Sequence, residues 1–398
     1  MLTLDEARAL IARHIHLLPP ERVPLAEAHG RTLRESVSAP ADLPAFDRSA
    51  YDGYALRSAE APARLRVVGE RAAGAQPGEP LGVGECARIF TGAQLPPGAD
   101  AVAMQEHVAR DGDHATIPAT PHGHGVRWRG EDARAGHLLL SRGQRLGAVE
   151  CSLLATLGHT QPLVAPRVRI HHIVTGTELV APEATPGPGQ IRESNSALLA
   201  ALAADAGAAF RTTGATGAGD DIASLLGMIQ SVPEESWELL LLSGGASVGD
   251  YDFGQRALAA LGFSVHFAAL DLRPGKPLIF ATRGRQLAFV IPGNPLSHYV
   301  CWHVAIRAAL DLLSKAETQL DLVQLPLSAA EPLPGNARET WWPARIAWHE
   351  GRAFAEPLKW QSSGDLTGIV GIRALLRIPA KAAPIAPGAL VEALLLSI

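Results

Sequence analysis

The sequence has 398 residues, an apolar fraction of 47% and a formal net charge of −5. Its length allows about two to four domains with sizeable cores, and the acidic balance without a Lys/Arg run argues against a nucleic-acid partner. It lacks the uncharged apolar stretch of about 18 residues that a membrane span needs, and its three distant cysteines exclude a disulfide scaffold and favour a reducing, cytoplasmic location.

The N-terminal segment predicts helices. Thr3 and Glu6 have the spacing of a capping box, apolar residues follow at helical spacing, and two prolines end the segment. Acidic residues come early and no apolar core segment follows, so we do not expect a signal peptide. A second short helix is expected over residues 25–33, and a further helix over 146–157 ends at Gly158.

Between these helices the chain is rich in glycine and proline. Short β-like runs at 65–68 and 101–104 predict a small all-β module over residues 43–131. The flanking residues, 1–42 and 132–165, are then expected to form one discontinuous, elongated helical domain into which the module is inserted.

Three polar residues of this region suit either a turn or a functional site. Asp52 lies in an Asp-Gly turn, Thr91 lies at the end of a strand, and Asp132 precedes another turn. Taken alone, each residue is explained at least as well by a structural turn. Their role therefore depends on what they meet in space.

From residue 166 the pattern becomes a repeat of strand, loop and helix. Strands are expected at 168–174, 210–215, 237–242, 265–270, 278–281 and 287–291, and helices at 196–206, 222–230, 255–261 and 299–313. Such repeats build a doubly wound parallel sheet, which is predicted for residues 166–318. His171 and His172 face opposite sides of their strand, so we expect one buried histidine and no metal-binding pair.

A glycine-rich loop follows the apolar run at 237–242. Its residues Ser243, Gly244, Gly245, Ser247 and Gly249 could present backbone N–H groups to a phosphate where a helix begins. Asp250 and Asp252 come next, and carboxylates beside a phosphate suit a divalent cation such as Mg²⁺. The spacing allows either carboxylate to hold the metal, and a plain turn with solvated aspartates explains the loop equally well.

Ligands bind such sheets outside the carboxyl ends of the strands. The loops at this edge carry Glu178, Asn195, Asp220, the segment 243–252, Lys276, Asn294, Pro295 and Ser297. Because these loops converge in space, we expect them to form a shared phosphate and metal site.

Residues 319–398 predict a second β domain. Strands at 340–348 and 353–358 flank a short turn with glycine, which indicates a hairpin. The candidate ligand groups of this region are Arg338, Arg345, Ser362 and Ser363.

Eight motifs carry a resemblance to a known family: PAFDRSAYDGYA, RIFTGAQLPPGADAVAMQE, VRWRGEDARAG, VTGTELV, IRESNS, LSGGASVGDYDF, RPGKP and IPGNPLS, in this order. Over nearly its whole length the chain resembles the MoeA-type molybdopterin molybdenumtransferases, the family that includes the E domain of gephyrin. The resemblance implies a multidomain α/β fold. Its parts are a MoaB/MogA-like doubly wound domain, the discontinuous helical domain, the inserted β module and a C-terminal β barrel.

The resemblance also implies a reaction. Adenylylated molybdopterin and molybdate are the substrates, molybdenum enters the dithiolene, the pyrophosphate link is cleaved, and AMP is released with Mg²⁺ as the required metal. The family further implies a homodimer whose active site lies between the α/β domain of one subunit and the N-terminal parts of the other. Molybdoenzymes or other proteins of the cofactor pathway are the implied partners.

Matching positions imply roles for single residues. Catalytic positions are matched by Asp52, Asp132, Asp220 and Lys276, and the metal site by Asp250 and Asp252, with the family match favouring Asp252. Substrate-binding positions are matched by Thr91, Glu178, Ser243, Gly244, Gly245, Ser247, Gly249, Arg273, Asn294, Pro295, Ser297, Arg338 and Ser363. Cleavage of a phosphoanhydride needs mainly positioning and charge neutralisation, so no Ser–His–Asp set is expected.

Some positions depart from the family pattern. Arg273 stands where many members have a lysine, Thr177 removes a charge near Glu178, and His298 adds a titrating group near the expected site. These changes bear on the preference for molybdate or tungstate. Two other functions fit part of the pattern: an adenylyltransferase, which needs neither flanking region, and a non-catalytic molybdopterin-binding scaffold, which needs no converging charges.

Overall fold

The computed structural model describes all residues except 77, 214–220, 245–252, 315–319 and 397–398. Its contacts divide the chain into two units, which we call unit 1 (residues 1–34 and 163–398) and unit 2 (residues 35–162). This grouping does not test the predicted division into four domains, which stays a prediction.

Unit 1 contains a six-stranded sheet. Its order is β16 (Ala209–Thr213), β13 (Arg169–Val174), β17 (Leu239–Ser243), β21 (Gln286–Ile291), β20 (Ile279–Arg283) and β18 (Ser264–Phe267). The first four strands are parallel, as predicted, whereas β20 and β18 add an antiparallel edge. Only residues 284–285 separate β20 from β21, and so short a connection leaves no room for the crossover that a parallel pair needs.

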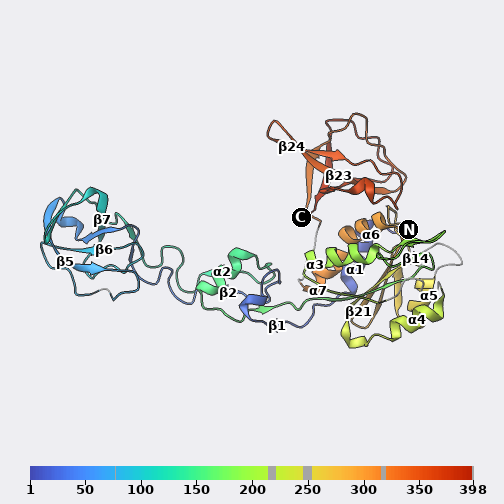
Figure 1. The fold of residues 1–398 in the computed structure, drawn as a ribbon, viewed down its shortest axis with the longest axis horizontal. Coiled ribbons are helices and arrows are strands. Elements are labelled where there is room, and N and C mark those ends of the chain that lie inside the picture. Colours follow the sequence, from blue (N-terminus) through green and yellow to red (C-terminus); the bar gives the residue numbers. More distant parts are fainter. Residues whose placement is uncertain (77, 214–220, 245–252, 315–319, 397–398) are drawn as a thin grey trace. The chain divides into compact units, whose positions relative to one another are not determined.

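Helices cover both faces of this sheet (Figure 1). In β17, Leu239 and Leu241 belong to one buried cluster, while Leu240 and Leu242 belong to another. The first cluster includes residues of α1 (Leu4–His14), α3 (Asn195–Asp205), α6 (Pro295–Cys301) and α7 (Arg307–Ser314), and the second includes residues of α4 (Ile222–Gln230) and α5 (Phe253–Ala260). Because both faces are buried, the strand is apolar at every position, which is why it stands out in the sequence.

The first helix begins as its capping box predicts. The Thr3 hydroxyl accepts a hydrogen bond from the Glu6 backbone N–H at 3.2 Å, and the Glu6 carboxylate accepts from the Thr3 N–H at 2.8 Å. Leu4, Ala7 and Ile11 are buried in the same cluster as α7. The N-terminal helix therefore packs on the α/β sheet of unit 1.

Two predicted helices are different in the structure. Over residues 25–33 only Leu25–Glu27 forms a helical turn, of the 3-10 type, and Gly30 turns away with a φ of 75°. The nearby strand β1 (Glu21–Arg22) pairs with β12 (Leu163–Val164). The helix expected over 299–313 is divided into α6, a π-helical turn Trp302–Ile306 and α7.

The C-terminal part of unit 1 forms a second six-stranded sheet. Its path is β19 (Leu272–Arg273), β23 (Glu339–His349), β25 (Ala374–Ile378), β26 (Leu390–Leu395) and β22 (Leu322–Pro326), with β24 (Arg352–Pro357) on β23. The predicted hairpin is confirmed as β23–β24. A bridge between Leu327 and Ala355 joins the end of β22 to β24, so the sheet curls back on itself as a barrel requires.

Unit 2 is built mainly of short strands. Its main sheet has the order β7 (Ala101–Met104), β4 (Gly53–Leu56), β6 (Glu85–Ile89), β5 (Ala63–Arg71), β9 (His114–Ile117) and β8 (Ala109–Asp111). Further pairs are β3 (Arg48–Ser49) with β10 (Val126–Arg127) and β2 (Val37–Ser38) with β11 (Leu138–Leu140). Helix α2 (Ala148–Thr156) ends two residues before Gly158, which has a φ of 71°, as the sequence predicts.

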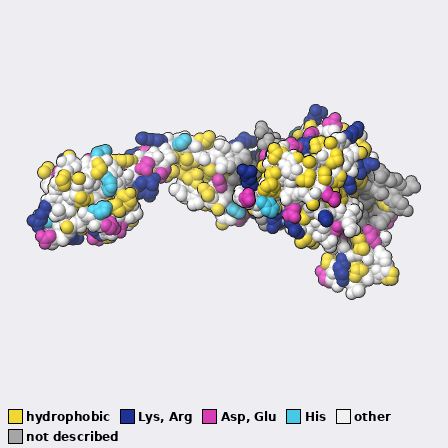
Figure 2. Space-filling view, turned by 90° about the horizontal axis from the view of Figure 1, so that it is seen from above, with side chains coloured by type: hydrophobic (Ala, Val, Ile, Leu, Met, Phe, Trp, Pro, Cys, Tyr) yellow, Lys and Arg dark blue, Asp and Glu magenta, His cyan; other side chains and the backbone are white. Residues whose placement is uncertain are grey.

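The surface is mixed in charge. On the face in Figure 2, Lys and Arg side chains are interspersed with Asp and Glu side chains on both units. Among the described residues, no helix has the length and apolar character needed to cross a bilayer.

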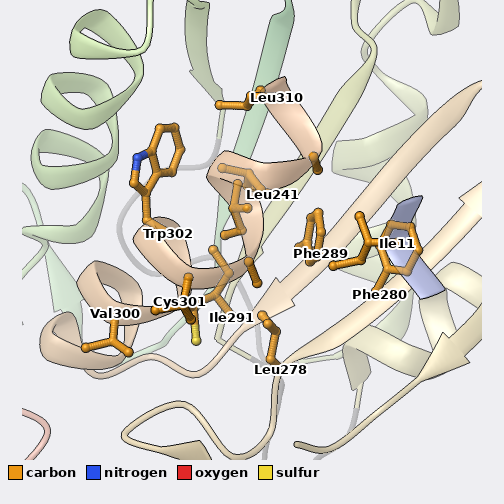
Figure 3. Packing of buried hydrophobic residues seen from close by; sticks show 14 of the residues in the cluster. Ile11, Leu241, Leu278, Phe280, Phe289, Ile291, Val300, Cys301, Trp302 and Leu310 are labelled. Carbon is orange, nitrogen blue, oxygen red and sulfur yellow. The ribbon is translucent and has the colours of Figure 1, made fainter. Parts of the chain in front are cut away.

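Phe289 offers a test of the sheet core. It is fully buried, its ring centroid lies 4.9 Å from that of Phe280, and both are drawn in Figure 3. We expect Phe289→Ala to lower the free energy of unfolding of unit 1 by about 3–5 kcal/mol, because it deletes a fully buried ring. Denaturant unfolding measures this change. Leu390→Ala, at a side chain that is 65% exposed, is the control and should change it by less than about 0.5 kcal/mol; equal effects would contradict the described packing.

Candidate functional site: an anion cleft beside the carboxyl edge of the sheet

The strand β17 ends at the carboxyl edge of the parallel strands, where the glycine-rich loop begins. Gly244 has a φ of +96°, and a Cβ atom there would lie 2.8 Å from the Thr175 carbonyl oxygen. Only glycine fits this exit from the sheet without strain. Gly245, Ser247, Gly249, Asp250 and Asp252, like Asp220 in the preceding loop, lie outside the described residues.

Two buried histidines bond to Ser243 at this edge. The Ser243 hydroxyl lies 2.6 Å from His172 Nε2 and 2.6 Å from His298 Nε2. All three residues are buried. His171 is buried too, so both histidines of β13 are inside the fold, not only one of them as predicted.

The partners of the two rings fix the direction of these bonds. His298 Nδ1 lies 3.1 Å from the Asn294 carbonyl oxygen, which can only accept, so Nδ1 carries the proton. In the neutral ring, Nε2 then accepts from the Ser243 hydroxyl, and that hydroxyl in turn accepts from His172 Nε2–H. His172 Nδ1 is left as the acceptor for the hydroxyls of Ser196 and Thr212, each 3.3 Å away. Every hydrogen-bonding group in this series of His172, Ser243 and His298 therefore has a partner when both histidines are neutral.

Burial keeps His172 and His298 neutral. Desolvation lowers the pKa of His172 to about 3 and that of His298 to about 4. The expectation that His298 adds a titrating group near the site is therefore wrong for neutral pH. Its ring instead ties the start of α6 to the end of β17.

A cleft of about 290 Å³ lies next to this edge, between the α/β sheet and the C-terminal sheet of unit 1. Seven predicted site residues line it: Arg273, Lys276, Asn294, Ser297, Arg338, Ser362 and Ser363. The structure thus brings together residues from four separate stretches of the chain.

Strand pairing places two of the cations where β19 meets the start of β23. Arg273 ends β19, which pairs in parallel with the start of β23, and Arg338 immediately precedes β23. The Arg338 guanidinium donates a hydrogen bond to the Leu272 carbonyl oxygen at 3.1 Å. Lys276 directly follows Gly275. Gly275 has a φ of +106°, and a Cβ atom there would lie 2.5 Å from Cys301 Sγ.

The charge of the cleft is one-sided. Three cationic side chains line it, and none of the described lining residues is acidic. Within the described part of the chain, the side chains of Arg273 and Lys276 have no hydrogen-bond or ion-pair partner. Unpaired cations next to hydroxyl and amide groups are suited to bind an anion with several oxygen atoms.

Hydrogen bonds join the start of α6 to Ser363 in the C-terminal part of the cleft lining. The Asn294 side-chain amide donates to the Ser363 hydroxyl at 2.7 Å, and the Leu296 N–H donates to the Ser363 carbonyl at 3.0 Å. Pro295 is the first residue of α6 and is not among the lining residues. The Asn195 side chain donates to the Gly293 carbonyl at 2.8 Å, which holds the turn in front of α6.

Other predicted residues lie apart from the cleft lining. Glu178 is exposed in the loop after β13, and Arg345 donates to the Val370 carbonyl. Trp360 and Gln361 line the cleft and were not predicted. Their position just before Ser362 and Ser363 was the available signal, but an aromatic ring is not a typical anion ligand.

In unit 2 two of the predicted residues meet. The Asp52 carboxylate accepts from the Thr91 N–H at 2.8 Å and from the Thr91 hydroxyl at 2.7 Å. The backbone N–H and then the hydroxyl lower the pKa of Asp52 below its usual value. Asp132 is exposed and accepts from Arg127 at 2.5 Å. Among the described residues, no group of three or more His, Cys, Asp or Glu could hold a metal ion.

The fold and the cleft define a class: a multidomain α/β protein with an anion-suited cleft between a doubly wound sheet and a C-terminal β sheet. Three family models cover most of the chain. They are the MoeA N-terminal region (domain I and II) over residues 2–158, a probable molybdopterin binding domain over 171–312, and the MoeA C-terminal region (domain IV) over 326–396.

Known proteins are similar to this chain over nearly its full length. A molybdopterin molybdenumtransferase of Nostoc sp. is 35% identical and covers 90% of this chain and 85% of that protein. One from Bacillus subtilis is 30% identical and covers 99% and 94%. The crystal structure of the molybdopterin biosynthesis moeA protein from Pyrococcus horikoshii has a TM-score of 0.82 at 26% identity and covers 100% of both chains.

The chain belongs to the molybdopterin molybdenumtransferase family. The matches to both flanking regions speak against an adenylyltransferase that consists of the α/β domain alone.

The two buried histidines predict a loss of stability in acid. In the unfolded chain a histidine binds its proton near pH 6.5, whereas His172 and His298 do so only near 3 and 4 when folded. Between these values the unfolded chain binds more protons, so stability falls as pH falls from about 6.5 to 4. His298→Gln should make this dependence shallower by about 1.4 kcal/mol per pH unit, as measured by denaturant unfolding at several pH values. His349→Gln, at an exposed histidine, should leave the slope unchanged; an unchanged slope for His298→Gln as well would contradict the buried, neutral ring.

Proposed function

We propose that this protein inserts molybdenum from molybdate into adenylylated molybdopterin and releases AMP in a Mg²⁺-dependent reaction. Family membership supports the reaction class. The observation that carries the proposal is the cleft with three cations and no acidic residue among its described lining residues. Molybdate is a dianion with four oxygen acceptors, and it suits such a lining.

The cationic residues take the oxyanion in this proposal. Arg273 and Arg338 offer planar forks of N–H donors, and Lys276 offers a point charge with three donors. Ser297 and Ser363 hydroxyls and the Asn294 amide supply neutral groups in the same cleft. Donors held in place before the reaction stabilise charge on a reacting oxyanion without reorganisation.

The organic substrate is assigned to the adjoining edge of the sheet. Ser243 and Gly244 lead from β17 into the glycine-rich loop, whose backbone N–H groups would bind the pyrophosphate. The His172–Ser243–His298 chain and the bond from Asn195 to the Gly293 carbonyl hold this edge beside the cleft. Residues Gly245, Ser247, Gly249 and Asp220 stay proposals from the sequence.

Asp250 and Asp252 are the proposed Mg²⁺ ligands. Both follow the carboxyl end of β17, and carboxylate oxygens are the hard donors that this ion prefers. When bound, Mg²⁺ would neutralise charge on the phosphoanhydride.

A second subunit is proposed to complete the site. Asp52, Thr91 and Asp132 lie in unit 2, and Glu178 lies outside the cleft lining. We propose that the Asp52–Thr91 pair and Asp132 act on the substrate bound to the α/β sheet of the partner subunit in a homodimer.

The three cysteines are free, which supports a reducing, cytoplasmic location.

An AMP-release assay tests the proposed reaction. Purified protein is mixed with adenylylated molybdopterin and Mg²⁺, with or without molybdate, and AMP and molybdenum cofactor are measured. We expect AMP release that depends on both molybdate and Mg²⁺, with cofactor formed in equal amount. AMP release without molybdate, or none with it, would contradict metal insertion.

Lys276→Ala tests the role of the cleft. Loss of one preorganised charge at a reacting oxyanion lowers kcat by about 100- to 1,000-fold, and we expect this in the AMP-release assay. Lys359→Ala, at an exposed lysine that is not among the cleft-lining residues, is the matched control and should retain full activity. Equal activity of both variants would show that the cleft is not the reaction site.

A further inference from the structure

A tryptophan from the C-terminal part forms one wall of the cleft. The Arg273 guanidinium lies over the Trp360 ring, 5.2 Å from its centroid. Trp342 contacts Trp360 edge to face, with centroids 5.6 Å apart and an interplanar angle of 70°. The Trp342 Nε1–H donates to the Leu358 carbonyl at 2.9 Å, so the pair of rings is anchored to the C-terminal backbone.

This stack is the contact that orients Arg273. An aromatic face attracts a cation, and a guanidinium group packs flat against it. Among the described residues, the Arg273 side chain has no hydrogen bond or ion pair that would fix its plane. Without the ring, a long and flexible side chain would have to be ordered each time an anion binds.

We infer that Trp360 is a positioning residue of the cleft, which holds the Arg273 guanidinium in the orientation that binds an oxyanion. The C-terminal part thereby acts on a cation that the α/β part contributes. This inference rests on the proposed function for the identity of the anion.

The arrangement also explains why an arginine suits position 273. A lysine ammonium is a compact charge and gains less from an extended ring than a planar guanidinium does. Arg273 and Trp360 are therefore one functional pair. The pair would bind either inorganic molybdate or a phosphoryl group of the organic substrate, since both present several anionic oxygens.

Direct binding separates these two sources. The full-length protein is titrated by calorimetry with molybdate alone, and separately with AMP alone. We expect Trp360→Leu to weaken molybdate binding by about two- to thirtyfold, the range of a cation–π contact, and to leave AMP binding unchanged. A loss confined to AMP would assign the pair to the phosphoryl group and overturn the molybdate assignment.

Further variants separate positioning from packing, because Trp360 also packs against the buried cluster of the sheet. Trp360→Phe keeps an aromatic face and should restore most of the affinity, whereas a packing role predicts that Phe and Leu behave alike. In an Arg273→Lys background, Trp360→Leu should cause little further loss. In the AMP-release assay, Trp360→Leu should raise the KM for molybdate with little change in kcat. Trp348→Leu, at an indole that is 69% exposed, is the control and should bind as the wild type does.

Three results would overturn the inference: unchanged molybdate affinity in folded Trp360→Leu, equal losses in the wild-type and Arg273→Lys backgrounds, or a loss in kcat alone. Failure of the proposed function has a different signature. In that case the wild type would bind molybdate in a Trp360-dependent way and yet release no AMP in response to it.

Discussion

The parallel pairing of β19 with β23 is the contact on which the proposed site depends. By sequence β19 belongs to the α/β part, yet it hydrogen-bonds into the C-terminal sheet. The pairing places Arg273 on β19 and Arg338 directly before β23, and the Leu272 carbonyl accepts a hydrogen bond from the Arg338 guanidinium. The Ser363 contacts with Asn294 and Leu296 fasten the other wall. The two parts of unit 1 thus build the cleft only when they are docked.

This docking has an electrostatic consequence. It brings three cations together without a described acidic residue among the lining, and like charges that approach one another raise the free energy of the empty cleft. A dianion removes this repulsion, so binding energy is available where the charges converge. The neutral histidines beneath the edge add no further positive charge. Stability and anion binding are therefore linked through the same few side chains.

Local patterns predicted much of this fold. The capping residues Thr3 and Glu6 marked α1, and the doubly buried run in β17 marked the parallel sheet, because these signals depend on near neighbours only. The sequence patterns also predicted seven cleft residues. They did not show that β19 joins the C-terminal sheet, that Ser243 lies between two histidines, or that Trp360 stacks on Arg273. These features arise from tertiary register, which a two-residue strand or a single ring does not encode locally.

The central claim is that molybdate binds between the α/β and C-terminal parts of unit 1. Crystals soaked in molybdate and measured at the molybdenum absorption edge would locate the metal directly by its anomalous signal. We predict one strong peak in the cleft. It should lie where the oxygen atoms of the molybdate accept hydrogen bonds from the Arg273, Lys276 and Arg338 side chains. A strong peak elsewhere with an empty cleft would contradict the account.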